Sequence, residues 1–388
     1  MNILHVIASL AQETGGPAKA VLEMAEAVAG RGHTLTVFST DFGGVPDTLD
    51  RLREAGVTVR VFPVEAPRIW KRSPQLAAAL ADAIPDMDAV HIHSLYLYHD
   101  WVAGGLCRRY GVPYIVRPHG SLDPFLYKRH RFRKSVMDVW FQNRMLREAA
   151  AVHFTTEEEH QLARPYISGA PGAVVANGIN FADYAEVPPE GLLRRRYPQL
   201  ADSRIVLFLS RLNFKKGLDV LIPAFSEAAK DADDLRLVLA GPDDGMESRA
   251  RAWAREYGIE DKTVFTGMLT GSEIQEAYRD AEMFALPSYS ENFGIAVVEA
   301  MAMGVPVLIS DKVNIWREVA GAGAGLVSAP EVDSFAELIA RAAAPDFDLA
   351  GMGAKARELA QRRFDWSEIG GDLEALYRSV SEPLAKAA

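Results

Sequence analysis

The sequence predicts an α/β protein with two domains, each a parallel sheet covered by helices. Short apolar runs rich in β-branched residues alternate with amphipathic stretches, which is typical of βαβ units. This pattern breaks at 177–203, where Asn177-Gly178 and Pro188-Pro189 stand in a polar stretch, and then restarts. A length of 388 residues also exceeds what one ordinary hydrophobic core holds.

The periodicity gives the expected elements in order. In the first half we expect strands at 3–8, 34–39, 58–62, 89–93, 113–117, 151–155 and 173–176. In the second half we expect strands at 205–210, 235–240, 263–266, 283–286, 305–309 and 325–327. The polar stretch 177–203 between them is interpreted as a hinge or linker, and a last helix is expected at about 368–380.

Composition narrows the class of protein. The hydrophobic content of 49% is that of a globular chain, and no run of about 18 uncharged apolar residues is present to span a membrane. The first residues lack a basic segment, so export is not expected. The single Cys107 cannot form an internal disulfide, in keeping with a cytoplasmic location. A net charge of −10 argues against a general nucleic-acid binder.

Two glutamates, Glu291 and Glu299, stand in an otherwise apolar segment. Because a buried carboxylate is costly without a polar partner, something polar is expected to reach Glu299. Eight positions of helical rise correspond to about 12 Å. That separation suits two anchors on an elongated polar ligand such as a nucleotide sugar.

A strand followed by a basic turn lies about 75 residues upstream, where Arg211 and Lys216 could neutralise a diphosphate. This turn, 207–217, and the Glu-x7-Glu segment together resemble family 4 of the retaining glycosyltransferases, and the resemblance extends along almost the whole chain. It implies the GT-B architecture, in which two Rossmann-like domains face each other across a cleft. The expected domains are 1–176 plus about 367–388 for the acceptor and 177–366 for the donor.

The resemblance also implies the reaction and the residues that perform it. A sugar moves with retention from a UDP- or GDP-sugar to a glycan or lipid-linked acceptor, as in the synthesis of bacterial surface polysaccharide. Arg211 and Lys216 are expected to hold the diphosphate, Glu291 the sugar hydroxyls and Glu299 the ribose. The further residues expected around the donor are Gly241, Met268, Leu269, Asn292, Phe293 and Gly294.

Two glycines lie in the loop after the first expected strand, at 3–8. Gly15 and Gly16 precede an amphipathic helix, so backbone N–H groups there could approach an anion, as the family's first glycine loop does. The alternative is a tight turn without a ligand.

Histidines follow or lie on other strands. His119 comes just after the strand at 113–117, at the edge where open α/β sheets bind ligands, and the resemblance places it beside the transferred sugar. His91, His93 and His99 could face a metal, but no third ligand at a suitable spacing is evident. The sequence also presents no Asp-x-Asp motif of the kind that metal-dependent glycosyltransferases use to hold a donor diphosphate, so no metal and no cofactor are expected.

A basic segment interrupts the acidic chain between 128 and 147, with seven Lys or Arg against Asp138. Aromatic residues are interleaved with the charges, which favours contact with an anionic membrane. The alternative is a solvated basic helix. The residues expected to contact the membrane or the acceptor are Lys128, Arg129, Arg131, Arg133, Lys134 and Trp140.

Two other functions share this architecture. A sugar-nucleotide epimerase or hydrolase would turn over the donor without an acceptor, but it would not explain the basic segment after His119. A non-catalytic nucleotide-sugar binding protein would usually have lost some of Arg211, Lys216, Glu291 and His119, and all four are present.

Overall fold

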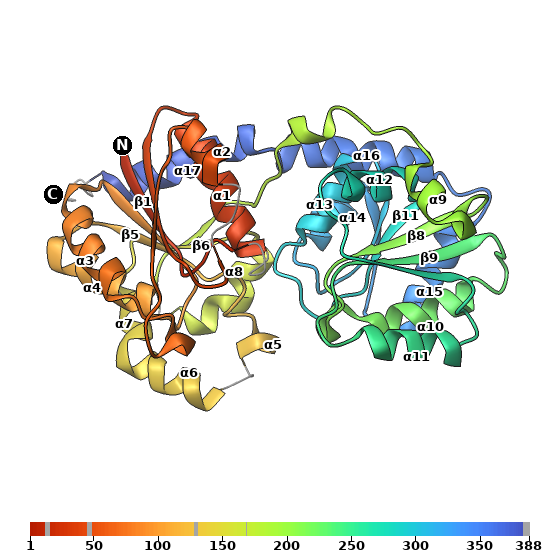
Figure 1. Cartoon of the computed structure of the whole chain (residues 1–388), viewed down its shortest axis with the longest axis horizontal. Coiled ribbons are helices and arrows are strands. Elements are labelled where there is room, and N and C mark those ends of the chain that lie inside the picture. The colour runs from red at the N-terminus through yellow and green to blue at the C-terminus, as the bar shows by residue number, and fades with distance from the viewer. Residues whose placement is uncertain (12–15, 45–48, 128–130, 168, 383–388) are drawn as a thin grey trace. The chain divides into compact units, whose positions relative to one another are not determined.

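The structure is a computed structural model that describes residues 1–11, 16–44, 49–127, 131–167 and 169–382 (Figure 1). The chain divides into two compact units, Met1–Gly178 with Trp366–Ala388, and Ile179–Asp365. We call them the first and the second unit. Each is built on one parallel sheet with helices, so the predicted α/β class is confirmed.

The first unit holds a seven-stranded sheet in the order β3-β2-β1-β4-β5-β6-β7, and every described pairing is parallel. Its strands are β1 (Asn2–Val6), β2 (Thr34–Thr40), β3 (Thr58–Phe62), β4 (Ala89–His93), β5 (Tyr114–Arg117), β6 (Ala151–Phe154) and β7 (Gly172–Val174). Its helices are α1 (Gly16–Ala29), α2 (Leu49–Glu54), α3 (Pro74–Ala83), α4 (Tyr98–Tyr110), α5 (Pro124–Tyr127), α6 (Arg131–Met137), α7 (Asn143–Arg147), α8 (Glu157–Ala163) and α17 (Trp366–Ser381).

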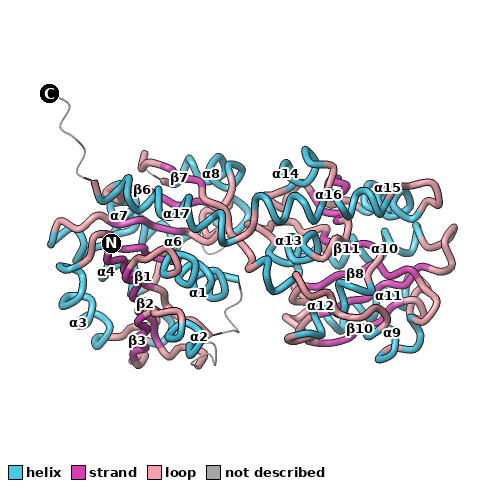
Figure 2. Tube along the Cα trace, turned by 90° about the horizontal axis from the view of Figure 1, so that it is seen from above, coloured by secondary structure: helices cyan, strands magenta, loops and turns pink. Residues whose placement is uncertain are grey.

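Alternation along these strands gives the sheet two differently covered faces. Leu4, Val90 and Val116 pack toward α3, α4 and α7. The residues one position away, such as Ile3 and Ile115, pack toward α1 and α17 on the other face. Figure 2 shows α1 and α4 on opposite sides of the strands near β1.

The second unit holds a six-stranded parallel sheet in the order β10-β9-β8-β11-β12-β13. Its strands are β8 (Arg204–Leu209), β9 (Leu235–Ala240), β10 (Thr263–Gly267), β11 (Met283–Leu286), β12 (Val307–Ser310) and β13 (Gly325–Ser328). Its helices are α9 (Leu192–Arg196), α10 (Leu218–Ala228), α11 (Glu247–Glu256), α12 (Ser272–Asp280), α13 (Ile295–Ala302), α14 (Trp316–Ala322), α15 (Val332–Ala343) and α16 (Leu349–Arg363).

All thirteen expected strands are present, with their ends shifted by two residues at most. The last helix, expected at about 368–380, is α17. Among the described residues, no helix combines the length and the apolar character that crossing a membrane requires.

The stretch 177–203, expected to be a hinge or linker, is instead largely folded onto the second unit. The buried carboxylate of Asp280 accepts hydrogen bonds from the backbone N–H groups of Gly191 (2.6 Å) and Arg194 (3.1 Å). The Arg194 guanidinium in turn donates to the carbonyls of Leu200 and Ser203. These side-chain bonds hold a polar stretch that carries too few apolar residues for its order to be read from sequence periodicity.

Gly217 marks a close approach between the segments that follow β8 and β11. Its backbone has φ +72°, and a Cβ atom added there would lie 2.0 Å from the carbonyl oxygen of Pro287. Only glycine fits, because the obstacle is backbone rather than a movable side chain.

We expect Gly217→Ala to lower the free energy of unfolding by about 3 kcal/mol or more, since both an unfavourable φ and a backbone clash arise. Gly258→Ala is the matched control, because Gly258 has φ +68° with open space around its Cα. It should cost only about 1 kcal/mol. Chemical denaturation measures both values, and equal losses would contradict a close approach at Gly217.

Candidate active site

The carboxyl edge of the second unit's sheet carries most of the residues predicted to bind the donor. Arg211 follows β8, Gly241 follows β9, Met268 follows β10 and Glu291 follows β11. Because the strands are parallel, these segments leave the sheet at one edge. The strand order reverses between β8 and β11, the kind of position at which open α/β sheets bind ligands.

Lys216 and Glu291 form an ion pair at this reversal. Lys216 ends the short helical turn Phe214–Lys216, whose start is capped by the Asn213 side chain accepting from Lys215 N–H. The Glu291 backbone N–H donates to Lys312 O (2.9 Å), which ties the glutamate to the segment after β12. The lysine side chain is 10% exposed and the glutamate side chain 16%, so solvent screens the pair only weakly.

Electrostatics at this pair favour an anion. Burial raises the pKa of Glu291, but the positive charges of Lys216, Lys215 and Arg211 outweigh burial and hold that pKa below its usual value. Arg211 also pairs with Asp244, at 2.9 Å. Three cations and the carboxylates of Glu291 and Asp244 therefore lie near one another at this sheet edge.

Glu299 lies in α13 and is 7% exposed. Its carboxylate accepts a hydrogen bond from the hydroxyl of Tyr278 at 3.2 Å, so a polar group reaches the buried acid as expected. Burial, and then the nearby Glu299 charge, raise the pKa of that tyrosine. The helix begins only at Ile295, after Gly294 with φ +82°. Glu291 therefore precedes the helix, and the estimate of eight helical positions between the glutamates is wrong.

The other predicted donor residues differ in how exposed they are. Phe293 is 2% exposed and packs edge-on against Phe364, so its ring belongs to the core and only its backbone can meet a ligand. Leu269 is also buried, whereas Met268 is 54% exposed. Gly241 packs tightly, because a Cβ there would lie 2.0 Å from the carbonyl oxygen of Ser210. Asn292, which lies between Glu291 and Phe293, is half-buried.

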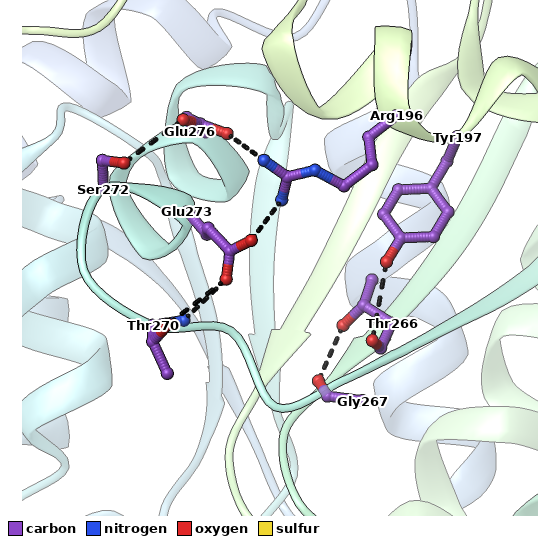
Figure 3. Close-up of polar contacts among 8 residues, drawn as sticks. All are labelled: Arg196, Tyr197, Thr266, Gly267, Thr270, Ser272, Glu273 and Glu276. Carbon is purple, nitrogen blue, oxygen red and sulfur yellow. Dashed lines mark hydrogen bonds and ion pairs between the residues drawn. The ribbon is translucent and has the colours of Figure 1, made fainter.

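Polar contacts hold the loop from β10 to α12, which carries Met268 and Leu269 (Figure 3). Arg196 of α9 pairs with Glu273 at 3.1 Å and with Glu276 at 2.9 Å. Glu273 also accepts from the backbone N–H of Thr270, at 3.0 Å. The Gly241 backbone N–H donates to Gly267 O at 2.8 Å, so two of the predicted segments are joined directly.

In the first unit, His119 lies two residues after β5, with φ +50°, and is half-buried. Glu159 holds the turn, since its carboxylate accepts from the Gly120 N–H (3.1 Å) and from both the N–H and the hydroxyl of Thr155 (2.7 and 2.8 Å). Burial raises the pKa of Glu159. Burial and the Arg117 charge lower the pKa of His119 well below its usual value, so its imidazole is neutral at pH 7.

His91 and His93 do have a third imidazole beside them, contrary to expectation. His5, from β1, pairs with His91 in the sheet register, and one ring nitrogen from each of the three residues lies within 4.8 Å of the other two. All three are fully buried. His99 instead contacts the carbonyl of His93, at 2.6 Å. In the sequence, His5 stands out as a histidine inside the apolar run 3–8. Its partners His91 and His93 lie on β4, far along the chain, so no local pattern connects them.

Several predicted residues lie outside what the structure describes. These are Gly15, Lys128 and Arg129, together with the side chains of Arg131 and Arg133. Gly16 begins α1 and is exposed.

The other two residues expected to contact the membrane or the acceptor, Lys134 and Trp140, differ in their surroundings. The ammonium of Lys134 lies over the rings of Tyr96 and Tyr127 and donates to the carbonyl of Ser121, so it faces the protein. Trp140 is 58% exposed.

The chain is similar to known glycosyltransferases. The family description "Glycosyl transferases group 1" matches residues 192–358, and "Glycosyl transferase 4-like domain" matches residues 15–178. The GDP-mannose:cellobiosyl-diphosphopolyprenol alpha-mannosyltransferase of Xanthomonas oryzae pv. oryzae (strain PXO99A) is 27% identical over 390 residues, 96% of this chain and 95% of the relative.

A second relative is the phosphatidyl-myo-inositol mannosyltransferase of Mycolicibacterium smegmatis, 31% identical over 55% of this chain and 53% of its own length. Among solved structures, Anabaena HepE in complex with UDP and glucose superposes with a TM-score of 0.78 over 98% of this chain and 100% of that one, at 21% identity.

The two parallel-sheet units and these matches define a glycosyltransferase. The chain belongs to family 4 of the GT-B glycosyltransferases.

We expect Glu291→Gln to lower the free energy of unfolding by about 3 kcal/mol at pH 7, because Lys216 would keep its buried charge without a partner. The folded-state pKa of Glu291 lies below its ordinary value of 4.5, so this stabilisation is present above pH 4.5 and is lost as the pH falls through the folded-state pKa. The difference between wild type and variant should therefore shrink in acid.

Denaturation at pH 7, 5 and 4 measures this difference. Glu260→Gln is the control, since the Glu260 side chain is 68% exposed in its ion pair with Arg255. Its effect should stay within about 0.5 kcal/mol. A pH-independent difference for Glu291→Gln would contradict a charged pair.

Proposed function

We propose that this protein transfers a sugar, with retention of anomeric configuration, from a UDP- or GDP-sugar to a glycan or lipid-linked acceptor in bacterial surface polysaccharide synthesis. The observation that carries the proposal is the grouping of Arg211, Lys216 and Glu291 where the second unit's strand order reverses. A diphosphate is the part of the donor that such a cationic edge suits best.

The donor diphosphate binds Arg211 and Lys216. As the glycosidic bond breaks, negative charge grows on the departing phosphate, and the two cations stabilise it. They take the place of a divalent metal, so the reaction is metal-independent. Glu291 then accepts hydrogen bonds from sugar hydroxyls, and Glu299 accepts them from the ribose.

In this proposal the anomeric configuration is retained without a nucleophilic residue of the protein. The acceptor hydroxyl attacks from the face that the phosphate leaves, and the phosphate oxygen takes the acceptor's proton. His119 contacts the transferred sugar through its imidazole. A double displacement would need two close carboxylates at the anomeric carbon. In the second unit Glu291 is instead occupied by Lys216.

The similar proteins guide the choice of donor and acceptor. The Xanthomonas oryzae relative uses GDP-mannose and a diphosphopolyprenol-linked sugar. The HepE structure holds UDP and glucose. Because the first of these matches nearly the whole chain, a lipid-linked acceptor at the inner face of the cytoplasmic membrane is the acceptor class we propose.

Exposed apolar side chains support a membrane contact in the first unit. Val139 is 86% exposed, Ile69 71%, Trp140 58% and Val136 55%. The Trp140 ring lies 5.8 Å from that of Trp70, the residue that follows Ile69 in the chain. Tryptophan beside aliphatic residues and basic charge is typical of a surface that enters the lipid headgroup region.

Donor binding is tested by titrating UDP-, GDP- and ADP-sugars calorimetrically in the presence of EDTA. We expect one nucleotide class to bind, and Lys216→Met to weaken its affinity by about tenfold to a hundredfold, the effect of losing one charge-assisted hydrogen bond. Lys230→Met is the control, because the Lys230 side chain is 63% exposed in the same unit. Unchanged affinity in Lys216→Met, or binding that requires a divalent ion, would sink the proposal.

Membrane contact is tested by co-sedimentation with vesicles of phosphatidylglycerol and phosphatidylcholine. Because Val139 is expected to bury apolar surface in the lipid, Val139→Asp should weaken binding by about fivefold or more. Val187→Asp is the matched control, since Val187 is an exposed valine of the second unit. Equal binding by the two variants, or no binding by the wild type, would rule this surface out.

A further inference from the structure

Six polar side-chain rings are connected by hydrogen bonds in one linear series, on the face of the first unit's sheet that α1 and α17 cover. We call this series the ring chain. Five of its members are buried, and the sixth, His119, is half-buried. In order the ring chain runs His119, His93, His5, Tyr377, His91 and His153, and it ends on the carbonyl of Val175.

The contacts use both nitrogens of every internal imidazole. His119 Nε2 lies 3.1 Å from His93 Nδ1, and His93 Nε2 lies 3.3 Å from His5 Nδ1. His5 Nε2 lies 2.9 Å from the Tyr377 hydroxyl, which lies 2.8 Å from His91 Nδ1. His91 Nε2 lies 3.3 Å from His153 Nδ1, and His153 Nε2 lies 2.8 Å from Val175 O.

These imidazoles are neutral. Burial lowers the pKa of His5 to about 3, and it lowers the pKa values of His91, His93 and His153 well below the usual range. The buried Arg117 guanidinium, which donates to the Asn177 side chain at 2.5 Å, lowers them further by charge repulsion. Each ring therefore carries one proton, with one nitrogen donating and the other accepting.

The carbonyl at one end sets the direction of every bond. A carbonyl oxygen only accepts, so His153 carries its proton on Nε2 and its Nδ1 must accept from His91 Nε2. His91 Nδ1 then accepts from the Tyr377 hydroxyl, whose oxygen accepts from His5 Nε2. By the same step His5 Nδ1 accepts from His93 Nε2, and His93 Nδ1 accepts from His119 Nε2.

We propose that the ring chain fixes His119 as the tautomer with its proton on Nε2, so that its Nδ1 presents a lone pair to a hydroxyl of the transferred sugar. His93, His5, Tyr377, His91 and His153 are positioning residues in this account. The role of the lone pair rests on the proposed function, whereas the tautomer itself does not. Among the described residues, the structure gives His119 Nδ1 no hydrogen-bond partner.

The contact at the Val175 end of the ring chain determines how strongly one tautomer is favoured over the other. Reversing the ring chain would turn the bare Nε2 of His153 toward the Val175 carbonyl, so that two lone pairs would face each other 2.8 Å apart. A buried polar group left unpaired in this way favours the original tautomer by about tenfold or more. The preference reaches His119 only while each link is intact. Tyr377, contributed by α17, is the one link between His5 and His91 in the ring chain.

A metal ion at His5, His91 and His93 is the competing explanation of this cluster. It would need three bare nitrogens directed at one point. In the ring chain each bare nitrogen of these residues already accepts a hydrogen bond, so no lone pair is left for an ion. The two explanations predict different proton positions.

The test is a long-range proton–nitrogen NMR correlation of the full-length protein labelled with nitrogen-15 in its nine histidines. We expect His119 and the other four histidines of the ring chain to appear at pH 7 as single tautomers protonated on Nε2. A proton on Nδ1 of His119, a mixture of its tautomers, or stoichiometric metal in the purified protein would overturn the inference.

Tyr377→Phe breaks the ring chain at its middle, and Tyr114→Phe is the control. Tyr114 is a buried tyrosine of the same unit whose hydroxyl donates to Met145 O at 2.7 Å, outside the ring chain. We expect Tyr377→Phe to turn the His119 signal into a mixture and to lower kcat by about twofold to tenfold, with donor KM nearly unchanged. Tyr114→Phe should match the wild type in both readouts.

An unchanged His119 signal in Tyr377→Phe would refute positioning by the ring chain. If that variant does not fold, the wild-type spectrum still decides the tautomer. A wild-type protein with the expected tautomers but no transferase activity would refute the proposed function and leave the ring chain standing. A protein that transfers the sugar but has His119 protonated on Nδ1 would refute the role of the ring chain and leave the proposed function standing.

Discussion

The pairing of β11 with β8 is the constraint on which the candidate site depends. It brings Met283 and Phe284 beside Val206 and Leu207, and so places the segments that carry Lys216 and Glu291, 75 residues apart, at one point of the sheet edge. Gly217 permits this approach, because any side chain there would meet the backbone of Pro287. The ion pair is therefore a product of sheet topology as much as of the two side chains.

The same topology explains why the site suits an anion. Arg211, Lys215 and Lys216 all follow β8 within a few residues, and their charges hold the pKa of Glu291 below its usual value. In the proposed function, a donor diphosphate carries more negative charge than one carboxylate and so competes with Glu291 for Lys216. Glu291 would then be released to accept hydrogen bonds from hydroxyls.

The sequence allowed the strands to be predicted well, because parallel strands buried on both faces are apolar runs of high contrast. It also identified Arg211, Lys216 and Glu291 as residues of one site, through a family resemblance. It could not show that Lys216 pairs with Glu291, that Asp280 folds the stretch 177–203 onto the second unit, or that His5 and Tyr377 meet. Each of these contacts joins residues that are distant in the chain, and no local pattern encodes them.

A crystal structure of the protein with a non-transferable 2-fluoro analogue of its nucleotide-sugar donor, grown in EDTA, tests the central claim most directly. The account predicts that the diphosphate contacts Arg211 and Lys216 at the β8–β11 reversal, with Glu291 released toward the sugar and no metal ion between. A diphosphate bound at another edge, or held through a metal ion while Lys216 stays paired with Glu291, would contradict it.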